Sequence, residues 1–323
     1  MRLEYQILAA MGLDLLLGDP RWFPHPVKLI GRFAERLELP LRRAIPQASS
    51  AGILAWLVVV GTTGCATFGL VWGAGRVHPV LGDVVRVLVL YTSLAARDLL
   101  RHSLAVYRAL QAEDLPEARR RVSLIVGRDT DRLDEAGVTR AAVESVAESL
   151  VDGIAAPLFF GVLAGPVGAM VYKAINTLDS TFGYKSEQYL HFGWASARAD
   201  DVANYLPARL TAPLVALAAI PLGGRPWDAL RILFRDGRKH ASPNAGLAEA
   251  VVAGALGVQL GGVNYYLGEP LEKPTIGDPL TPLNRSHIPK ANALILMAYI
   301  LAAALFLGVR WVVLWLSHIR GVA

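Results

Sequence analysis

Long uncharged runs dominate the hydropathy pattern of this chain. Residues Ala51–Gly75 carry no charge, and neither do residues Ala291–Val309, after which an apolar stretch continues beyond Arg310. Each run has roughly the 20 residues that a helix needs to cross the hydrocarbon core of a membrane. The pattern therefore predicts two membrane-spanning helices.

A third apolar stretch, Pro79–Ala96, follows the first after only residues 76–78. Its Asp83 and Arg86 are three residues apart, so on a helix they share a face and can pair. So short a connection predicts a tight helical hairpin. The segments that flank the hairpin then lie on the same side of the membrane.

Basic residues indicate which side that is. Residues 19–50 contain six Lys and Arg and residues 97–150 contain nine, whereas the short loops on the opposite side contain few. Residues 224–290 contain another eight. Because cytoplasmic loops carry an excess of Lys and Arg, these segments are predicted to be cytoplasmic.

A fourth apolar stretch, Ile154–Tyr172, contains Gly165-Pro166 near its middle. Proline removes a backbone donor and clashes with the preceding turn, so a straight helix is not expected there. One alternative is a kinked spanning helix. The other is a re-entrant pair of half-helices joined at Gly165-Pro166, with protein or a cavity around the turn.

The remaining segments are predicted to be helical as well. Residues 1–18 form a short retained membrane segment, and Leu210–Leu222 forms a buried or interfacial helix. Residues 97–150 form a cytoplasmic helical hairpin in which Asp114 caps the second helix, and Thr139 can cap the helix that follows. "GLAEAVVAGALGVQLGG" has a helical pattern rich in small residues, which favours close packing.

The predicted fold is therefore an all-α polytopic integral membrane protein. It has about four to six membrane helices, with the re-entrant alternative at the fourth stretch, and cytoplasmic helical loops. Residues 1–323 form a single membrane domain, from which loops 173–209 and 225–290 build a cytoplasmic site.

Composition agrees with a membrane protein that has substantial polar loops. The chain is 54% hydrophobic and 18% charged, with a mean hydropathy of +0.39. The net charge of +5 has no accompanying aromatic-basic or zinc pattern, so no nucleic-acid partner is predicted. Membrane lipid is the expected contact of the basic loops. Cys65 is the single cysteine, which excludes an intramolecular disulfide and a thiolate metal cluster.

Acidic residues lead directly into the fourth apolar stretch. Glu144, Glu148 and Asp152 are spaced at i, i+4 and i+8, so on a helix they share one face and repel one another. One interpretation is an ordinary solvated acidic face. The other is a site for a hard cation, since carboxylates with open positions suit Mg²⁺ that bridges to phosphate.

A denser polar segment follows at residues 172–210. Its polar members can bind phosphate and metal, and aromatic residues lie between them. They are Lys173, Asn176, Asp179, Lys185, Glu187, Arg198, Asp200, Asp201 and Asn204. This composition indicates a polar site beside a membrane.

Two further clusters carry candidate chemistry. "FRDGRKHASPNAG", residues 234–246, contains the basic Arg238, Lys239 and His240 and then Asn244. A basic loop that touches lipid is the alternative to a binding site. "GDPRWFPHPVKLIG" contains His25, although a lone histidine is more often structural. The chain contains neither a GxxxxGK[ST] nucleotide loop nor a GxSxG or HExxH motif.

Taken together, these clusters resemble the CbiB/CobD family of cobalamin biosynthesis, adenosylcobinamide-phosphate synthase. The matching stretches run in the family's order over nearly the whole chain. They are "GDPRWFPHPVKLIG", "GRDT", "ESVAESLVDGIAAPLF", "YKAINTLDSTFGYKSEQYLHFGWASARADDVANYLPARLTA", "RDGRKHASPNAG" and "ALGVQLGGVNYY". The chain departs from the family at Ser149, where asparagine is usual.

The resemblance implies an ATP- and Mg²⁺-dependent amide ligase. Its substrates would be adenosylcobyric acid and (R)-1-aminopropan-2-ol or its O-phosphate, with an acyl phosphate formed before the amine attacks. The product would be adenosylcobinamide or its phosphate. Other late cobalamin-assembly enzymes are the implied protein partners.

The candidate residues are assigned to roles in this reaction. Catalytic roles are expected for Glu144, Lys173, Asp179 and Asp201, and Mg²⁺ binding for Glu144, Glu148 and Asp152. Substrate and phosphate binding is expected for His25, Arg128, Asn176, Lys185, Arg198, Asn204, Arg238, Lys239, His240 and Asn244.

If residues 144–152 and residues 173–204 build one active site, both segments must lie on the same side of the membrane. This favours the re-entrant alternative for Ile154–Tyr172 and an active site on the cytoplasmic face of a multi-pass protein of the cell inner membrane. The alternative function is a corrinoid-binding scaffold or a transporter, which would use the intramembrane charges Asp14, Asp83 and Arg86.

Overall fold

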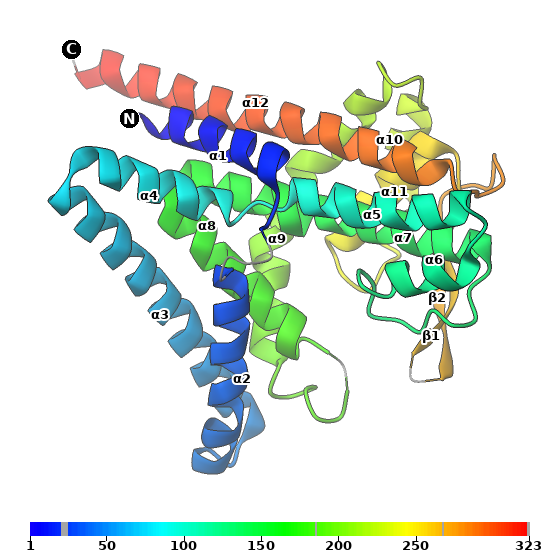
Figure 1. The fold of residues 1–323 in the computed structure, drawn as a ribbon, viewed down its shortest axis with the longest axis horizontal. Coiled ribbons are helices and arrows are strands. Elements are labelled where there is room, and N and C mark those ends of the chain that lie inside the picture. Colours follow the sequence, from blue (N-terminus) through cyan, green and yellow to red (C-terminus); the bar gives the residue numbers. More distant parts are fainter. Residues whose placement is uncertain (21–24, 185, 267, 322–323) are drawn as a thin grey trace. The chain divides into compact units, whose positions relative to one another are not determined.

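The chain is almost entirely helical, as predicted, with one two-stranded sheet (Figure 1). This computed structural model describes residues 1–20, 25–184, 186–266 and 268–321. The chain forms two compact units. Unit one comprises Met1–Ala95, Ala156–Asn204 and Leu305–Ala323, and unit two comprises Ala96–Ala155 and Tyr205–Ala304.

Unit one is built from helices alone within the described residues. They are α1 (Leu3–Leu17), α2 (Pro26–Ala44), α3 (Ala48–Val77), α4 (Pro79–Tyr91), α8 (Ala156–Phe182), the start of α9 (Trp194–Ala219) and the end of α12 (His287–Gly321). Helices α3 and α4 form the predicted tight hairpin. Asp83 and Arg86 lie 3.3 Å apart on α4, which confirms the predicted pair.

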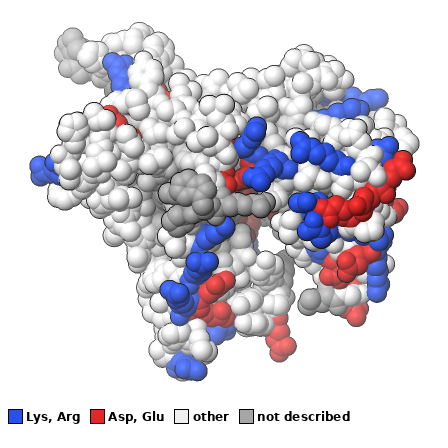
Figure 2. All heavy atoms as spheres, in the orientation of Figure 1, with Lys and Arg blue, Asp and Glu red and all other residues white. Residues whose placement is uncertain are grey.

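Helix α2 explains how a polar helix joins this unit. Its Ile30 and Ala34 are buried against Ala55 and Val59 of α3 and against Leu178 of α8, in a single apolar core. Its opposite side carries charges. On the face drawn in Figure 2, α3 is almost free of charge, whereas Lys, Arg, Asp and Glu gather over α2. This contrast is typical of a helix that lies outside the hydrocarbon beside one that lies inside it.

Helix α8 reverses direction at Ala164 and Gly165. Gly165 has a left-handed φ of 64°, and Ala164 also leaves helical geometry. The rings of Phe160 and Tyr172 stack with centroids 5.3 Å apart. Twelve residues of continuous helix would separate them by about 18 Å. The structure therefore supports the re-entrant pair of half-helices over the kinked span.

Gly168 permits the two half-helices to touch. A Cβ atom at this position would lie 2.5 Å from the Phe160 carbonyl oxygen. We expect Gly168→Val to force the half-helices apart and to destabilise the protein by about 2 kcal/mol. Thermal unfolding in detergent, followed by size-exclusion chromatography, measures the change. Gly69→Val in α3, where a Cβ would meet nothing within 4 Å, is the control. Equal midpoints for the two variants would contradict the hairpin.

Unit two combines helices with the sheet. It contains α5 (Ala96–Gln111), α6 (Leu115–Val122), α7 (Glu135–Leu150), a π-helical turn (Val151–Ala155), α10 (Pro226–Asp236), α11 (Ala245–Leu256), β1 (Leu260–Tyr266), β2 (Glu269–Ile276) and parts of α9 and α12. Helix α11 is buried over nearly its whole length and packs against α10 and α7.

The structure tests two predicted helix caps in this unit, Asp114 and Thr139. Asp114 caps α6, because its side chain accepts a 3.0 Å hydrogen bond from the Glu117 N–H. The prediction for Thr139 is wrong. Helix α7 begins earlier, where Asp134 accepts from the Gly137 N–H at 2.7 Å, and Thr139 is buried inside the helix. Both residue types can cap a helix, so spacing alone did not separate them.

The sheet was not predicted. Gly257 adopts a left-handed φ of 67° and ends α11, so the following residues of "GALGVQLGGVNYY" leave the helical path. Strand β1 then pairs antiparallel with β2, with an irregularity between Leu260 and Gly262. The hairpin covers part of the site described below.

Four stretches are long and apolar enough to cross a membrane, among the described residues. They are Ala48–Val77, Pro79–Gln111, Glu135–Phe182 and His287–Ile319. All three apolar runs predicted to span lie within them. The turn at Gly165 divides the third stretch into two helical parts. Each part is therefore shorter than the length of the whole stretch suggests.

Candidate functional site

An acid pocket of about 150 Å³ lies in unit two. It is lined by charged and polar groups from α7, α11, β2 and two loops: Arg128, Glu144, Glu148, His240, Glu249 and Lys273. Three carboxylates therefore face three groups that are cationic or can become so. Such a concentration of titratable groups in one small cavity is typical of a functional site.

Arg128 and Glu144 form the most enclosed ion pair around this pocket. An Arg128 Nη2 donates to Glu144 Oε2 at 2.5 Å, and both side chains are almost fully buried. The other Glu144 oxygen accepts from the Gly261 N–H at 2.8 Å. Arg128 also donates to the side-chain oxygen of Asn264 on β1. The pair thus joins α7 to the hairpin, and both Glu144 oxygens are already bonded.

Glu249 is the buried carboxylate of α11 beside this pair. Burial raises its pKa to about 8, and the negative charges of Glu144 and Glu148 contribute to the increase. His240 Nε2 lies 3.9 Å from Glu249 Oε1. A buried carboxyl with this pKa can hold a proton near neutral pH and release it in mildly alkaline solution.

The raised pKa of Glu249 predicts a pH-dependent stability. The free energy contributed by the protonated group is fully present below its ordinary pKa of 4.5 and is lost as pH rises through about 8. Glu249→Gln removes this loss. We therefore expect the variant to be more stable than the parent by up to about 5 kcal/mol at pH 9 and by little at pH 5.

Thermal unfolding in a chelating buffer tests this expectation, since no divalent cation then binds the carboxylates. Glu135→Gln, at an exposed position of the same unit, controls for the loss of one acid. A constant difference between Glu249→Gln and the parent from pH 5 to pH 9 would contradict the assignment.

The residues of the acid pocket fit a Mg²⁺ ion bound together with phosphate. Mg²⁺ is usually held by one or two carboxylates plus substrate phosphates rather than by a complete protein cage. Among the described residues, no group of three or more His, Cys, Asp or Glu forms such a cage. Arg128 Nε is buried without a hydrogen-bond partner in the described part of the chain, and a phosphate oxygen would satisfy it.

The predicted Mg²⁺ ligands are not equivalent in the structure. Glu144 and Glu148 line the pocket, but Glu144 is already bonded on both oxygens. Asp152 lies in the π-helical turn, where the α-helical register that placed the three acids on one face is not maintained. Glu249 was not predicted, yet it shares the pocket with Glu148.

A second buried polar cluster, the aspartate network, lies in unit one. Asp200 of α9 accepts hydrogen bonds from Asn176 of α8 at 3.2 Å and from Asn204 at 2.9 Å. The Tyr172 hydroxyl donates to the Asn204 side-chain oxygen at 2.8 Å. Burial raises the pKa of Asp200, while the two amide donors and the charge of Lys173 oppose the increase.

The aspartate network includes Lys173, Asn176 and Asn204 of the predicted residues, whereas Asp201 lies beside it and raises the pKa of Asp200 through its negative charge. Asp201 lies 3.7 Å from Arg198, whose side chain is exposed, so these two predicted residues pair on the outer side of α9. Asp179 lies half-buried near the end of α8. His25 Nε2 lies 3.3 Å from Asp19 Oδ1 at the start of α2. Lys185 lies outside the described residues.

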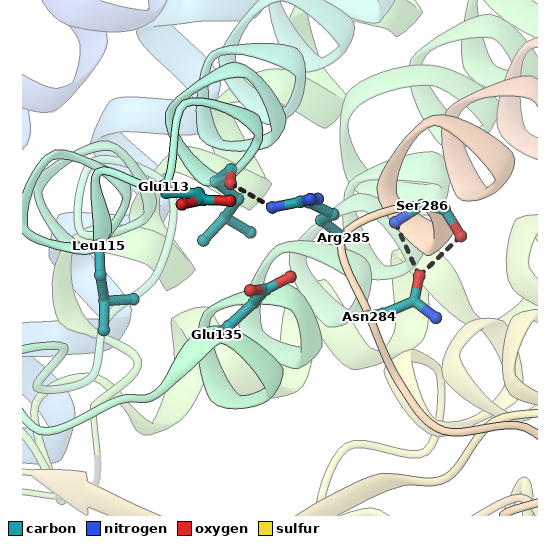
Figure 3. A pocket seen from close by; sticks show the side chains of 7 residues that line it. Glu113, Leu115, Glu135, Asn284, Arg285 and Ser286 are labelled. Atoms are coloured by element: carbon teal, nitrogen blue, oxygen red, sulfur yellow. Dashed lines mark hydrogen bonds between the residues drawn. The ribbon is translucent and has the colours of Figure 1, made fainter.

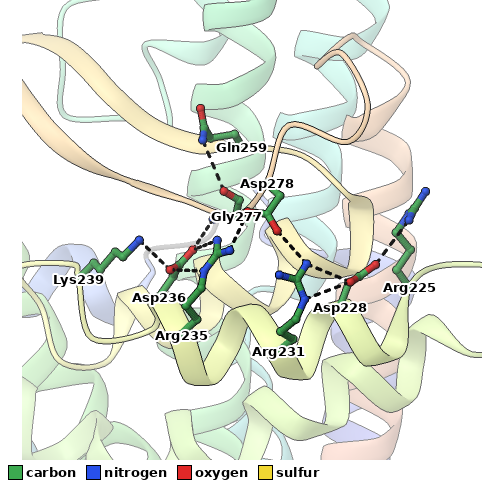
Figure 4. Close-up of polar contacts among 9 residues, drawn as sticks. All are labelled: Arg225, Asp228, Arg231, Arg235, Asp236, Lys239, Gln259, Gly277 and Asp278. Carbon is green, nitrogen blue, oxygen red and sulfur yellow. Dashed lines mark hydrogen bonds and ion pairs between the residues drawn. The ribbon is translucent and has the colours of Figure 1, made fainter.

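The basic cluster of residues 234–246 separates into three environments. Lys239 binds Asp236 at 2.7 Å, in the network of Figure 4. Arg238 is exposed, and His240 lines the acid pocket. Buried Asn244 accepts a hydrogen bond from Arg209 at 3.1 Å. The structure therefore does not gather these four predicted residues around one partner, because neighbouring side chains point to different ones.

A second, larger cavity in unit two lies apart from the predicted site residues. It measures about 580 Å³ and is lined by Glu113, Glu135 and Arg285, among others. Figure 3 shows Arg285 directed toward the carbonyl of Leu110, to which it donates at 2.8 Å. None of the predicted site residues lines this cavity.

Sequence reasoning missed several residues that complete the two clusters. Glu249 and Lys273 belong to the acid pocket, and Asn264 binds Arg128. Tyr172 belongs to the aspartate network, whereas Asp200 was already among the polar candidates of residues 172–210. An acid within the apolar run "GLAEAVVAGAL" was the available signal for Glu249, because a buried acid needs a partner.

The fold and these clusters define an all-α protein of membrane character with two buried polar centres. The CobD/Cbib protein family matches residues 7–295. The chain belongs to this family.

Individual relatives are similar in sequence to this chain over nearly their full length. The chain is 56% identical over 278 residues to a cobalamin biosynthesis protein CobD of Geobacter metallireducens, which covers 86% of this chain and 87% of the relative. It is 48% identical to CobD of Leptospira interrogans, over 93% of this chain and 95% of the relative. It is also 48% identical to CbiB of Salmonella choleraesuis, over 92% and 94% respectively. No solved structure shows a significant match.

Proposed function

We propose that this protein acts in cobalamin biosynthesis as an ATP- and Mg²⁺-dependent amide ligase. It would join a carboxylate of adenosylcobyric acid to (R)-1-aminopropan-2-ol or its O-phosphate. The names of the relatives support the pathway. The observation that carries the reaction class is the acid pocket, which combines carboxylates with buried cationic donors in one small cavity.

Amide formation from a carboxylate needs activation, because hydroxide is a poor leaving group. Transfer of a phosphoryl group from ATP would give an acyl phosphate, and attack by the free amine would then release phosphate. Phosphoryl transfer depends chiefly on positioned positive charge. Arg128 and Lys273 would contact phosphate oxygens, and Glu148 with Glu249 would hold Mg²⁺, which neutralises phosphate charge when bound.

The amine must lose a proton before or during its attack. A buried carboxylate can accept it. Within unit one, Asp200 is a better candidate for such a group than Asp179 or Asp201, because Asn176 and Asn204 hold both of its oxygens in the interior of that unit. Lys173 would neutralise an anionic part of the substrate beside it.

The orientation and location are proposals of the same kind. The excess of Lys and Arg around the first hairpin favours a multi-pass protein of the cell membrane with its site on the cytoplasmic side, where ATP is available. The transporter alternative is weaker, because Asp83 pairs with both Arg86 and the N-terminal amino group.

An end-point assay tests the ligase. Purified protein in detergent is incubated with adenosylcobyric acid, aminopropanol phosphate, ATP and Mg²⁺, and mass spectrometry detects the condensed corrinoid. We expect product from the parent, and a loss of about 100-fold or more in Glu148→Gln and Lys173→Ala.

Glu135→Gln is the matched control, because Glu135 is exposed and does not line the acid pocket. Its activity should equal that of the parent. A folded parent that binds the corrinoid but forms no product with either amine would overturn the ligase and favour a corrinoid-binding scaffold.

A further inference from the structure

Helix α10 of unit two has an apolar outer face as well as an apolar inner face. Its Ala229, Ile232 and Leu233 are buried, and the helix packs against α11. Trp227 and Phe234, seven residues apart and so on one side of the helix, are 81% and 83% exposed. Large aromatic side chains this exposed usually mark an interaction surface.

Apolar residues are also exposed along the second half of α9 and just after it. Leu206, Leu217 and Ile220 recur at helical spacing and are each at least half exposed. They precede α10 by only a short turn, in which Leu222 is also exposed. We call the exposed apolar residues Leu206, Leu217, Ile220, Leu222, Trp227 and Phe234 the outer stripe.

Arginine side chains border the outer stripe along α10. Arg231 and Arg235 are about half exposed, at 50% and 42%, while carboxylates hold one side of each guanidinium (Figure 4). Arg231 binds Asp278 at 2.7 Å, and Arg235 binds the same residue at 2.8 Å. Long basic side chains beside apolar ones are typical of helices whose charged ends reach phosphate groups of lipids.

We propose that α10 and the end of α9 lie in the headgroup layer of a phospholipid membrane. The outer stripe would enter the boundary with the acyl chains, and the arginines would contact lipid phosphates. Three observations favour lipid over a soluble partner. Tryptophan is enriched at membrane interfaces. The 11 residues of α10 are too few to span. The same chain carries four stretches long enough to cross a membrane.

Spin labels on the full-length protein test this proposal. In a Cys65→Ser background, single labels are attached through Trp227→Cys and Phe234→Cys, and the protein is reconstituted into phosphatidylcholine–phosphatidylglycerol vesicles. We expect both labels to collide more with oxygen, which concentrates in lipid, than with a water-soluble nickel reagent. A label at Glu113→Cys, an exposed polar position of unit two, should show the reverse order.

Two outcomes would overturn the proposal. Labels at 227 and 234 that collide with the nickel reagent as often as the control would place the stripe in water. Labels shielded from both reagents would indicate a protein neighbour, such as a second copy of the chain.

A measurement without labels covers the case in which these variants fail to fold. Lipids brominated near the headgroup should quench tryptophan fluorescence of the parent more than that of Trp227→Phe. Equal quenching would also overturn the proposal.

Discussion

Arg128→Ala is expected to abolish activity and to weaken unit two. The substitution leaves the Gly261 N–H as the remaining hydrogen-bond donor to the buried Glu144 carboxylate among the described residues, with the charge of Arg140 nearby, and it removes the donor to Asn264. Breaking a buried ion pair by removing one member costs about 3–5 kcal/mol. Loss of a phosphate donor should lower the rate of ligation by about 100-fold or more. Thermal unfolding and the mass-spectrometric assay measure the two effects.

A double variant separates the buried charge from other effects of the substitution. Glu144→Gln keeps the shape of the side chain but removes its charge. Arg128→Ala combined with Glu144→Gln should therefore be more stable than Arg128→Ala alone, while remaining inactive. If the second substitution lowered stability further, Glu144 would not depend on Arg128 for its charge compensation.

The membrane-type helices could be predicted because their signal is local. The uncharged run within α3, the short connection to α4 and Asp114 at the start of α6 each reflect a constraint that a short window of sequence contains. The Gly165-Pro166 break was also visible, although contacts between the half-helices, such as that of Phe160 with Tyr172, are needed to distinguish a hairpin from a kink.

The strand pair could not be predicted in the same way. Its start depends on the left-handed turn at Gly257, and small residues fit a buried helix as well as a strand. Strand pairing is decided by a partner segment rather than by local spacing.

The candidate site was predicted in outline and missed in detail for a related reason. The charged motifs identified Arg128, Glu144 and Lys173 as candidates, because a charge in an apolar environment is costly unless it is paired or functional. Which acids become buried depends on packing between segments far apart in sequence. Glu249 reaches the acid pocket because α11 packs against α7. Asp200 rather than its neighbour Asp201 faces the interior of unit one. A change of one position on a helix turns a side chain by about 100°.

Asp236 is expected to be the strongest electrostatic contributor outside the acid pocket. Its carboxylate is fully buried and accepts from Arg235, from Lys239 at 2.7 Å and from the Gly277 N–H at 2.9 Å (Figure 4). It thereby joins the end of α10 to the turn after β2. Gly277 has a φ of 88°, and a Cβ there would collide with the Val258 carbonyl, so the turn has little freedom to adjust.

Asp236→Asn should therefore destabilise the protein by about 3 kcal/mol at pH 7, because three donors lose a charged acceptor. The Arg235 guanidinium holds the pKa of Asp236 well below its usual range, with contributions from Lys239 and the Gly277 N–H. A depressed pKa adds stability above the ordinary value near 4, and this stability is lost as pH falls through the folded-state pKa. The advantage of the parent over the variant should thus begin to fall below about pH 4 and continue to fall toward the folded-state pKa.

Thermal unfolding of both proteins between pH 2 and pH 7 measures this decrease. Asp228→Asn is the matched control, because its carboxylate also pairs with arginines on α10 but is partly exposed. Exposed pairs contribute at most about 1 kcal/mol, so this control should change the midpoint little. If the two variants lost equal stability at pH 7, burial of Asp236 would not be the source of the effect. If the loss in Asp236→Asn did not depend on pH, its charge would not be the source.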